Sequence, residues 1–97
     1  MTYLDEIADK IRSEVPPERL PTGDTDPLFR MYAVLALAKG KKVTASDVHN
    51  AWVAWMREMN PSHESLKPFD QLDIRVQEQD QPYVDAIRQV TRGLGHA

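Results

Sequence analysis

The fold is decided by residues 43–59, which read VTASDVHNAWVAWMREM. Thr44 and Asp47 resemble a capping box, in which two side chains three residues apart bind the free backbone N–H groups at the start of a helix. Apolar side chains then recur at helical spacing, and Pro61 follows the last of them. Because proline disfavours helical backbone in the residue before it, the segment predicts a helix over residues 45–59.

Two more helices are predicted ahead of this one. Apolar residues recur at helical spacing over residues 3–14, and Pro16 stops the pattern. Asp26 suits the N-cap, Pro27 the first helical position and Gly40 the left-handed residue after the end. The residues between Pro27 and Gly40 leave almost no polar face, so this helix is expected at the centre, with part of it covered by a second chain.

The C-terminal half predicts a structured loop over residues 60–72 and a helical segment over residues 73–92. Pro82 cannot lie inside a helix without removing a hydrogen bond, so we expect a short helix over 74–80 and another that begins near Pro82. Residues 93–97 should fray. The predicted fold is one all-α domain over residues 1–97, a compact bundle of four or five short helices.

Composition excludes several classes of function. Cysteine is absent from the 97 residues, which rules out disulfides and thiolate sites. The net charge of −3 disfavours sequence-independent binding of nucleic acid, which depends on neutralising phosphates. The N-terminus lacks the features of a signal peptide, and the longest nearly uncharged run, residues 31–38, is too short to span a membrane. We therefore expect a cytoplasmic protein that does not contact membranes.

Trp52 and Trp55 lie one helical turn apart, with His49 one turn upstream. The two indoles could belong to the hydrophobic core, or they could form an aromatic wall that stacks a flat ligand or anchors a partner protein. One indole could also pack inward while the other borders a groove. His49 could be a structural hydrogen-bonding group or a donor to a ligand.

The sequence motifs for catalysis and metal binding are incomplete, because each lacks a required residue. His63-Glu64 lacks the second histidine of a zinc-protease helix, because Lys67 stands there. The lysine-rich stretch 38–44 does not match a phosphate-binding loop. Residues 45–59 expose few basic groups for the recognition helix of a DNA-binding protein. We also expect Asp80 to be a solvated residue without a chemical role, and we predict no enzyme activity, no metal site and no cofactor.

Three motifs in order resemble the ryanodine-receptor repeat domain. They are His49-x-x-Trp52, then Leu66-x-Pro68-Phe69-Asp70-x-Leu72, then Asp80 ahead of Val84-x-Ala86-Ile87, and together they cover about residues 45–90. The sequence departs from the family pattern in its short loop between Met59 and Leu66, in Phe69 where tyrosine or tryptophan is common, and in Pro82. The chain is also similar to small proteins of actinobacteria and their phages.

The resemblance implies a non-catalytic helical module. Repeats of this family often pair in tandem, so a chain with a single copy is expected to form a homodimer. Prokaryotic members have been proposed to sense nucleotide-type signals in conflict between phage and host, which suggests sensing or sequestering of such a signal. A protein-interaction adaptor is the alternative, and a DNA-binding regulator the third possibility.

The expected ligand is small and anionic or nucleotide-like, bound without chemistry. Trp52 or Trp55 would stack it, His49 would donate a hydrogen bond and Lys67 would supply positive charge. Phe69, in the loop that could fold back on the tryptophans, completes the predicted site.

Overall fold

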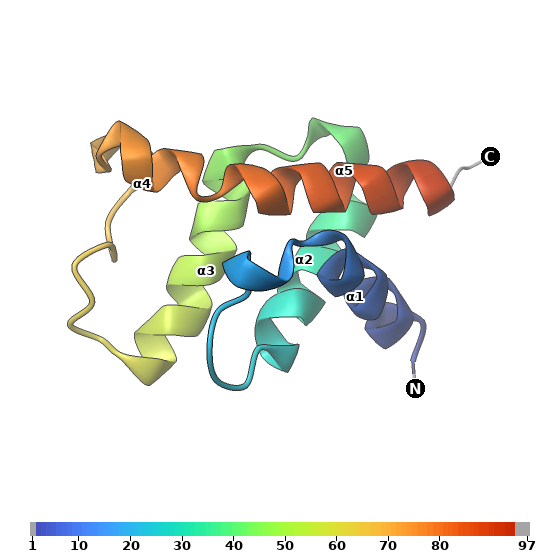
Figure 1. Ribbon diagram of the computed structural model, residues 1–97, viewed down its shortest axis with the longest axis horizontal. Coiled ribbons are helices and arrows are strands. Elements are labelled where there is room, and N and C mark those ends of the chain that lie inside the picture. The colour runs from blue at the N-terminus through green and yellow to red at the C-terminus, as the bar shows by residue number, and fades with distance from the viewer. Residues whose placement is uncertain (1, 95–97) are drawn as a thin grey trace.

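The computed structural model describes residues 2–94, and every regular element in that range is a helix, as predicted. The helices form a compact bundle in which α5 crosses the others along the long axis of the molecule (Figure 1). In chain order the elements are α1 (Tyr3–Glu14), η1 (Pro17–Arg19), α2 (Asp26–Ala38), η2 (Gly40–Lys42), α3 (Ala45–Met59), η3 (Phe69–Gln71), α4 (Ile74–Glu78) and α5 (Gln81–Leu94).

Helix α1 has the predicted bounds, and Arg12 near its end joins it to the start of α2. The guanidinium Nη2 lies 2.7 Å from Asp26 Oδ1 and 3.2 Å from Thr25 Oγ1. Asp26 was predicted as the N-cap of α2, but it is the first helical residue, and Thr25 occupies the cap position without a side-chain capping hydrogen bond. The reason is that the Asp26 carboxylate binds Arg12, while Asp24 Oδ1 accepts from the Asp26 N–H at 3.2 Å.

Helix α2 is central, because it contacts α1, α3 and α5. Its inward side chains, among them Leu28, Phe29 and Tyr32, are completely buried. It is not covered on all sides, however: Val34 and Leu37 are 51% and 53% exposed. The surplus apolar surface that the sequence indicated is therefore located on one outward face of this helix.

Helix α3 covers the predicted residues 45–59 and begins with the predicted capping box. Asp47 N–H donates to Thr44 Oγ1 over 3.2 Å, and Thr44 N–H donates to Asp47 Oδ2 over 2.9 Å. The second oxygen of Asp47 accepts from Lys39 Nζ at 2.8 Å, which ties the end of α2 to the start of α3. These bonds satisfy N–H groups that would otherwise lack partners at a helix start.

The predicted break before Pro82 is present. Helix α4 ends at Glu78, α5 begins at Gln81, and Asp80 lies in the turn between them. Residues 60–72 form a loop that contains η3, and Gln77 holds this loop to α4 by donating to the carbonyl oxygens of Phe69 and Leu72 at 2.9 and 3.1 Å. Of the tail predicted to fray, Gly93 and Leu94 belong to α5, and residues 95–97 lie outside the described residues.

The core is formed by α1, α2, α3 and α5. Tyr32 and Phe29 meet edge to face with ring centroids 5.4 Å apart, and Tyr83 of α5 packs against both. The core thus places two tyrosines of different helices side by side.

Among the residues that the structure describes, no helix is long and apolar enough to cross a membrane.

Candidate ligand-binding cavity

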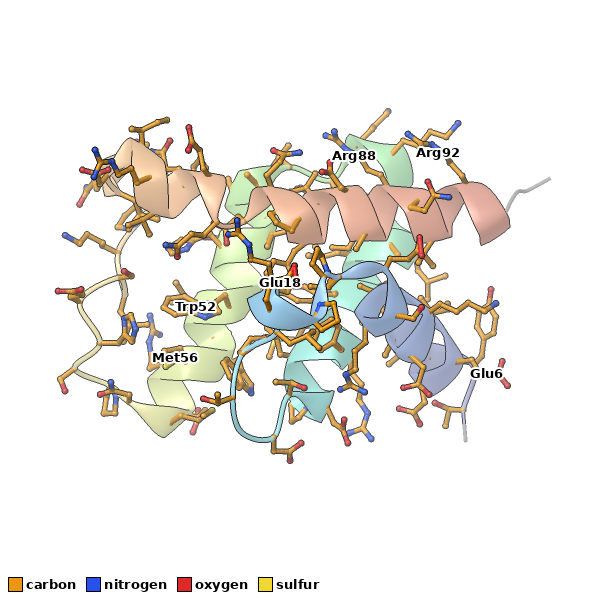
Figure 2. The ribbon with its side chains drawn as sticks, viewed as in Figure 1. Glu6, Glu18, Trp52, Met56, Arg88 and Arg92 are labelled. Atoms are coloured by element: carbon orange, nitrogen blue, oxygen red, sulfur yellow. The ribbon has the colours of Figure 1, made fainter. Side chains whose placement is uncertain are left out.

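A cavity of about 310 Å³ lies where four segments meet: the N-terminal connector between α1 and α2 (residues 15–25), α3, the loop after α3, and the turn between α4 and α5. In Figure 2, Trp52 of α3 and Glu18 of η1 are two of the side chains that line it. We call it the Asp80 cavity, and the lining residues used in the argument are Glu18, Arg19, Tyr32, His49, Trp52, His63, Asp80 and Tyr83. Its volume is at the lower end of the range for small-molecule sites.

Asp80 is the most unusual group in the cavity. Its side chain is 14% exposed, and its Oδ2 atom is buried without a hydrogen-bond partner. Burial raises the pKa of the Asp80 carboxyl to about 7, because a charge is costly to remove from water without compensation. The expectation that Asp80 is a solvated residue was therefore wrong. The connector and the loop fold over the turn that carries it.

His49 is an ionisable neighbour of Asp80. Its side chain is only 3% exposed, and its Nδ1 atom lies 3.8 Å from Asp80 Oδ2, too far for a hydrogen bond. The other ring nitrogen, Nε2, lies 2.7 Å from the backbone carbonyl oxygen of Lys67. Since a carbonyl oxygen only accepts, Nε2 carries a proton in this arrangement. In the neutral imidazole, Nδ1 therefore presents a lone pair toward the Asp80 carboxyl.

Two tyrosines complete the inner part of the cavity. Burial raises the pKa of Tyr83 to about 12 and that of Tyr32 well above its usual range, and the nearby Asp80 carboxylate adds to both effects. The Tyr83 hydroxyl donates to the backbone carbonyl of Arg19. This bond fixes η1 against α5, so it holds one wall of the cavity in place.

Trp52 forms the aromatic wall of the cavity. The His49 ring stacks on it, with centroids 5.6 Å apart and planes inclined by 23°. The His63 ring meets it edge to face at 5.0 Å. A ligand can therefore use only the part of the indole that His49 and His63 leave free, and full stacking would require His63 to move.

The family model of a domain of unknown function, DUF7701, matches residues 2–92 of the chain. The chain belongs to this family. No curated protein matches the chain, and no solved structure matches it. The match covers every described helix almost completely, so the cavity is a part of the DUF7701 domain itself.

The DUF7701 domain brings together only some of the predicted site residues. His49 and Trp52 line the cavity. Trp55 is 5% exposed and packs in the core, where its Nε1–H donates to the Asp24 carbonyl at 3.1 Å. Lys67 is exposed and contributes its backbone carbonyl to His49. Phe69 does not line the cavity, and its ring centroid lies 6.1 Å from that of His49.

Sequence reasoning did not select Asp80, Tyr32, Tyr83 or His63, although all four line the cavity. Periodicity assigned both tyrosines to apolar helix faces, and it gave no reason to expect their hydroxyls beside a carboxylate. One signal could have identified Asp80, since it is the aspartate of the third motif in the ryanodine-receptor resemblance. Within residues 2–94 no group of three or more His, Asp or Glu side chains could hold a metal ion.

Proposed function

We propose that this domain binds a small molecule in the Asp80 cavity and does not transform it chemically. The observation that carries the proposal is the buried Asp80 carboxyl, whose Oδ2 has no hydrogen-bond partner at the wall of a cavity of about 310 Å³. A buried polar group without a partner is costly. A ligand that donates a hydrogen bond to this carboxyl would offset that cost.

A nucleotide-type ligand, the class that the sequence suggested, would place its base inside the cavity. Amino and ring N–H groups of a base could donate to Asp80, and the free part of Trp52 offers an apolar contact. The phosphate would lie outside, near the exposed Arg19, because a phosphate next to Asp80 would meet like charge. Lys67 does not line the cavity, so its predicted role in charge neutralisation has no geometric support.

Tryptophan fluorescence and thermal shift against nucleosides, nucleotides and cyclic nucleotides test this proposal. Trp52 lines the cavity and Trp55 is buried elsewhere, so a bound ligand should change the emission of the protein and of Trp55→Phe. Trp52→Phe should lose most of the change while it keeps its thermal stability. A flat response over the whole panel, in a protein that folds normally, would reject a nucleotide-type ligand.

Val34 and Leu37 are exposed on the outward face of α2, and they favour a second function for that face, which is contact with another protein chain. They lie three residues apart and are therefore neighbours on one helix face. We propose that this face forms the contact of the expected homodimer, and it is also the surface that an adaptor would offer to another protein. This contact does not involve the cavity, so dimer formation and ligand binding can be tested separately.

A further inference from the structure

We infer that the ligand of the Asp80 cavity presents a positively charged nitrogen to the Asp80 carboxylate, as an organic ammonium or amidinium compound does. This inference rests on the proposed small-molecule function and names the chemical class of the ligand. It differs from the anionic ligand that the sequence suggested. The argument depends on which charged groups face Asp80 and which of them already have partners.

The Asp80 carboxylate has no lysine or arginine partner among the described residues. His49 Nδ1 lies 3.8 Å from its Oδ2 atom. His49 Nε2 is already engaged by the Lys67 carbonyl. Burial raises the pKa of Asp80, because the ionised carboxylate has lost contact with water. A ligand cation would supply the missing charge.

The other groups around the cavity do not take the place of a ligand cation beside Asp80. Tyr83 of α5 already donates its hydroxyl proton to the Arg19 carbonyl. Tyr32 of α2 forms no hydrogen bond with Asp80 within the described part of the chain. Glu18 of η1 adds a second carboxylate to the lining, and the His63 ring is packed against Trp52. An anionic ligand would therefore meet two carboxylates and one exposed arginine, which is unfavourable.

The aromatic side chains favour the same class of ligand. Tyr32, Tyr83 and Trp52 line the cavity around Asp80, and the faces of their rings carry partial negative charge that attracts organic cations. Tyr32 and Tyr83 are held with their ring centroids 5.5 Å apart in the core, so their positions are fixed before a ligand arrives. A carboxylate beside several aromatic rings is a suitable environment for an ammonium group.

The pKa of Asp80 gives the inference a distinctive pH dependence. A cation binds to the ionised carboxylate, so at low pH it must displace a proton. With a pKa of about 7 for the free site, the affinity should be about thirtyfold lower at pH 5.5 than well above pH 7. Binding near pH 6 should also release a proton, which calorimetry in buffers of different ionisation enthalpy detects.

Three probes of similar shape and different charge test the inference on the intact chain. They are benzylammonium, benzyl alcohol and benzoate, with binding followed by ligand-observed NMR and calorimetry at pH 8. We expect benzylammonium to bind about tenfold more tightly than benzyl alcohol, because both can donate a hydrogen bond to the carboxylate but only the ammonium adds the attraction of opposite charges. Benzoate should not bind. Asp80→Asn should abolish the preference, and Asp70→Asn, on the exposed surface of η3, should retain it.

The outcomes separate this inference from the proposed function. Equal binding of benzylammonium and benzyl alcohol, or an unchanged preference in Asp80→Asn, would overturn the inference. Binding of an anionic nucleotide to the same cavity, lost in Trp52→Phe, would overturn the inference and support the proposed function. If neither the three probes nor the nucleotide panel binds the folded protein, both proposals fail.

Discussion

The imidazole Nε2 of His49 lies 2.7 Å from the backbone carbonyl oxygen of Lys67 and joins α3 to the loop that follows it. The two residues are 18 positions apart in the sequence, and the ring that makes the bond is almost completely buried. The histidine therefore has a structural role in addition to lining the cavity. Of the two interpretations that the sequence left open for His49, this bond supports the structural one, and the role as a donor to a ligand stays a prediction.

We predict that His49→Ala destabilises the domain by about 2–4 kcal/mol, because it leaves a partly buried carbonyl without a partner and creates a cavity. Lys67→Ala is the matched control. It keeps the backbone carbonyl and removes only an exposed side chain, so it should change the free energy of unfolding by less than about 0.5 kcal/mol. Urea denaturation measures both values, and equal effects of the two variants would refute the structural role of His49.

The raised pKa of Asp80 predicts an unusual dependence of stability on pH. The folded-state pKa of about 7 exceeds the value of an unfolded aspartate, about 3.9, so the folded state binds the proton more tightly. The contribution of Asp80 to stability is therefore present below about pH 4, decreases as the pH rises to about 7, and then stays constant.

Asp80→Asn should remove this dependence. We expect the variant to be more stable than the unmodified protein at pH 8, by roughly 1–3 kcal/mol, and to differ little from it at pH 4. Thermal and urea denaturation over this pH range provide the measurement, with Asp70→Asn as a control for the loss of one negative charge. A difference in stability between Asp80→Asn and the unmodified protein that does not change with pH would show that the pKa of Asp80 is not raised in the folded state.

The two tryptophans should differ in their effect on stability. Trp55 is buried and donates to the Asp24 carbonyl, so Trp55→Ala should cost about 3–5 kcal/mol. Trp52 is only partly buried, and Trp52→Ala should cost clearly less. Denaturation of the two variants under the same conditions measures the two losses of stability. If Trp52→Ala is the more damaging change, then Trp52 is the core residue and the cavity wall needs another description.

Two glycines should respond to alanine in opposite ways. Gly40 has a φ of +55°, and an added Cβ would lie 3.3 Å from Thr91 Cγ2, so Gly40→Ala should cost about 1–2 kcal/mol. Gly93 lies in α5 with open space around the added atom, so Gly93→Ala should stabilise the domain by up to about 1 kcal/mol. The melting temperature should therefore fall in Gly40→Ala and rise in Gly93→Ala.

The outward face of α2 should control self-association. We expect the protein to sediment as a dimer and the double variant Val34→Glu, Leu37→Glu to sediment as a folded monomer, because paired glutamates in an apolar contact are strongly unfavourable. Sedimentation velocity and circular dichroism test the two parts of this expectation. An unmodified protein that stays monomeric at high concentration would reject the dimer on this face.

The helices could be predicted well because their limits depend on local chemistry. The bounds of α1 and α3 followed from apolar spacing, a capping box and a proline, and the turn before α5 followed from Pro82. These signals act within a few residues. Asp26 shows their limit, since its carboxylate binds Arg12 on another helix and Thr25 occupies the cap position in its place.

The cavity could not be predicted in the same way, because its lining comes from segments distant in the sequence. Asp80 looked solvated within its own polar segment, whereas its side chain is only 14% exposed in the fold. Trp52 and Trp55 lie on the same apolar stripe, and the pattern could not show which of the two would border a cavity. The resemblance motif included Asp80, but a motif alone does not show that a carboxylate lacks a partner.

The hydrogen bond from Tyr83 to the Arg19 carbonyl connects residues 64 positions apart. Because this bond closes one wall, the cavity exists only after α5 has docked against the N-terminal connector. During synthesis the nascent chain therefore has no binding site until α5 has left the ribosome. A ligand of this cavity would select the completed fold over every partly folded form, and its presence would slow hydrogen exchange throughout the core and not only around the site.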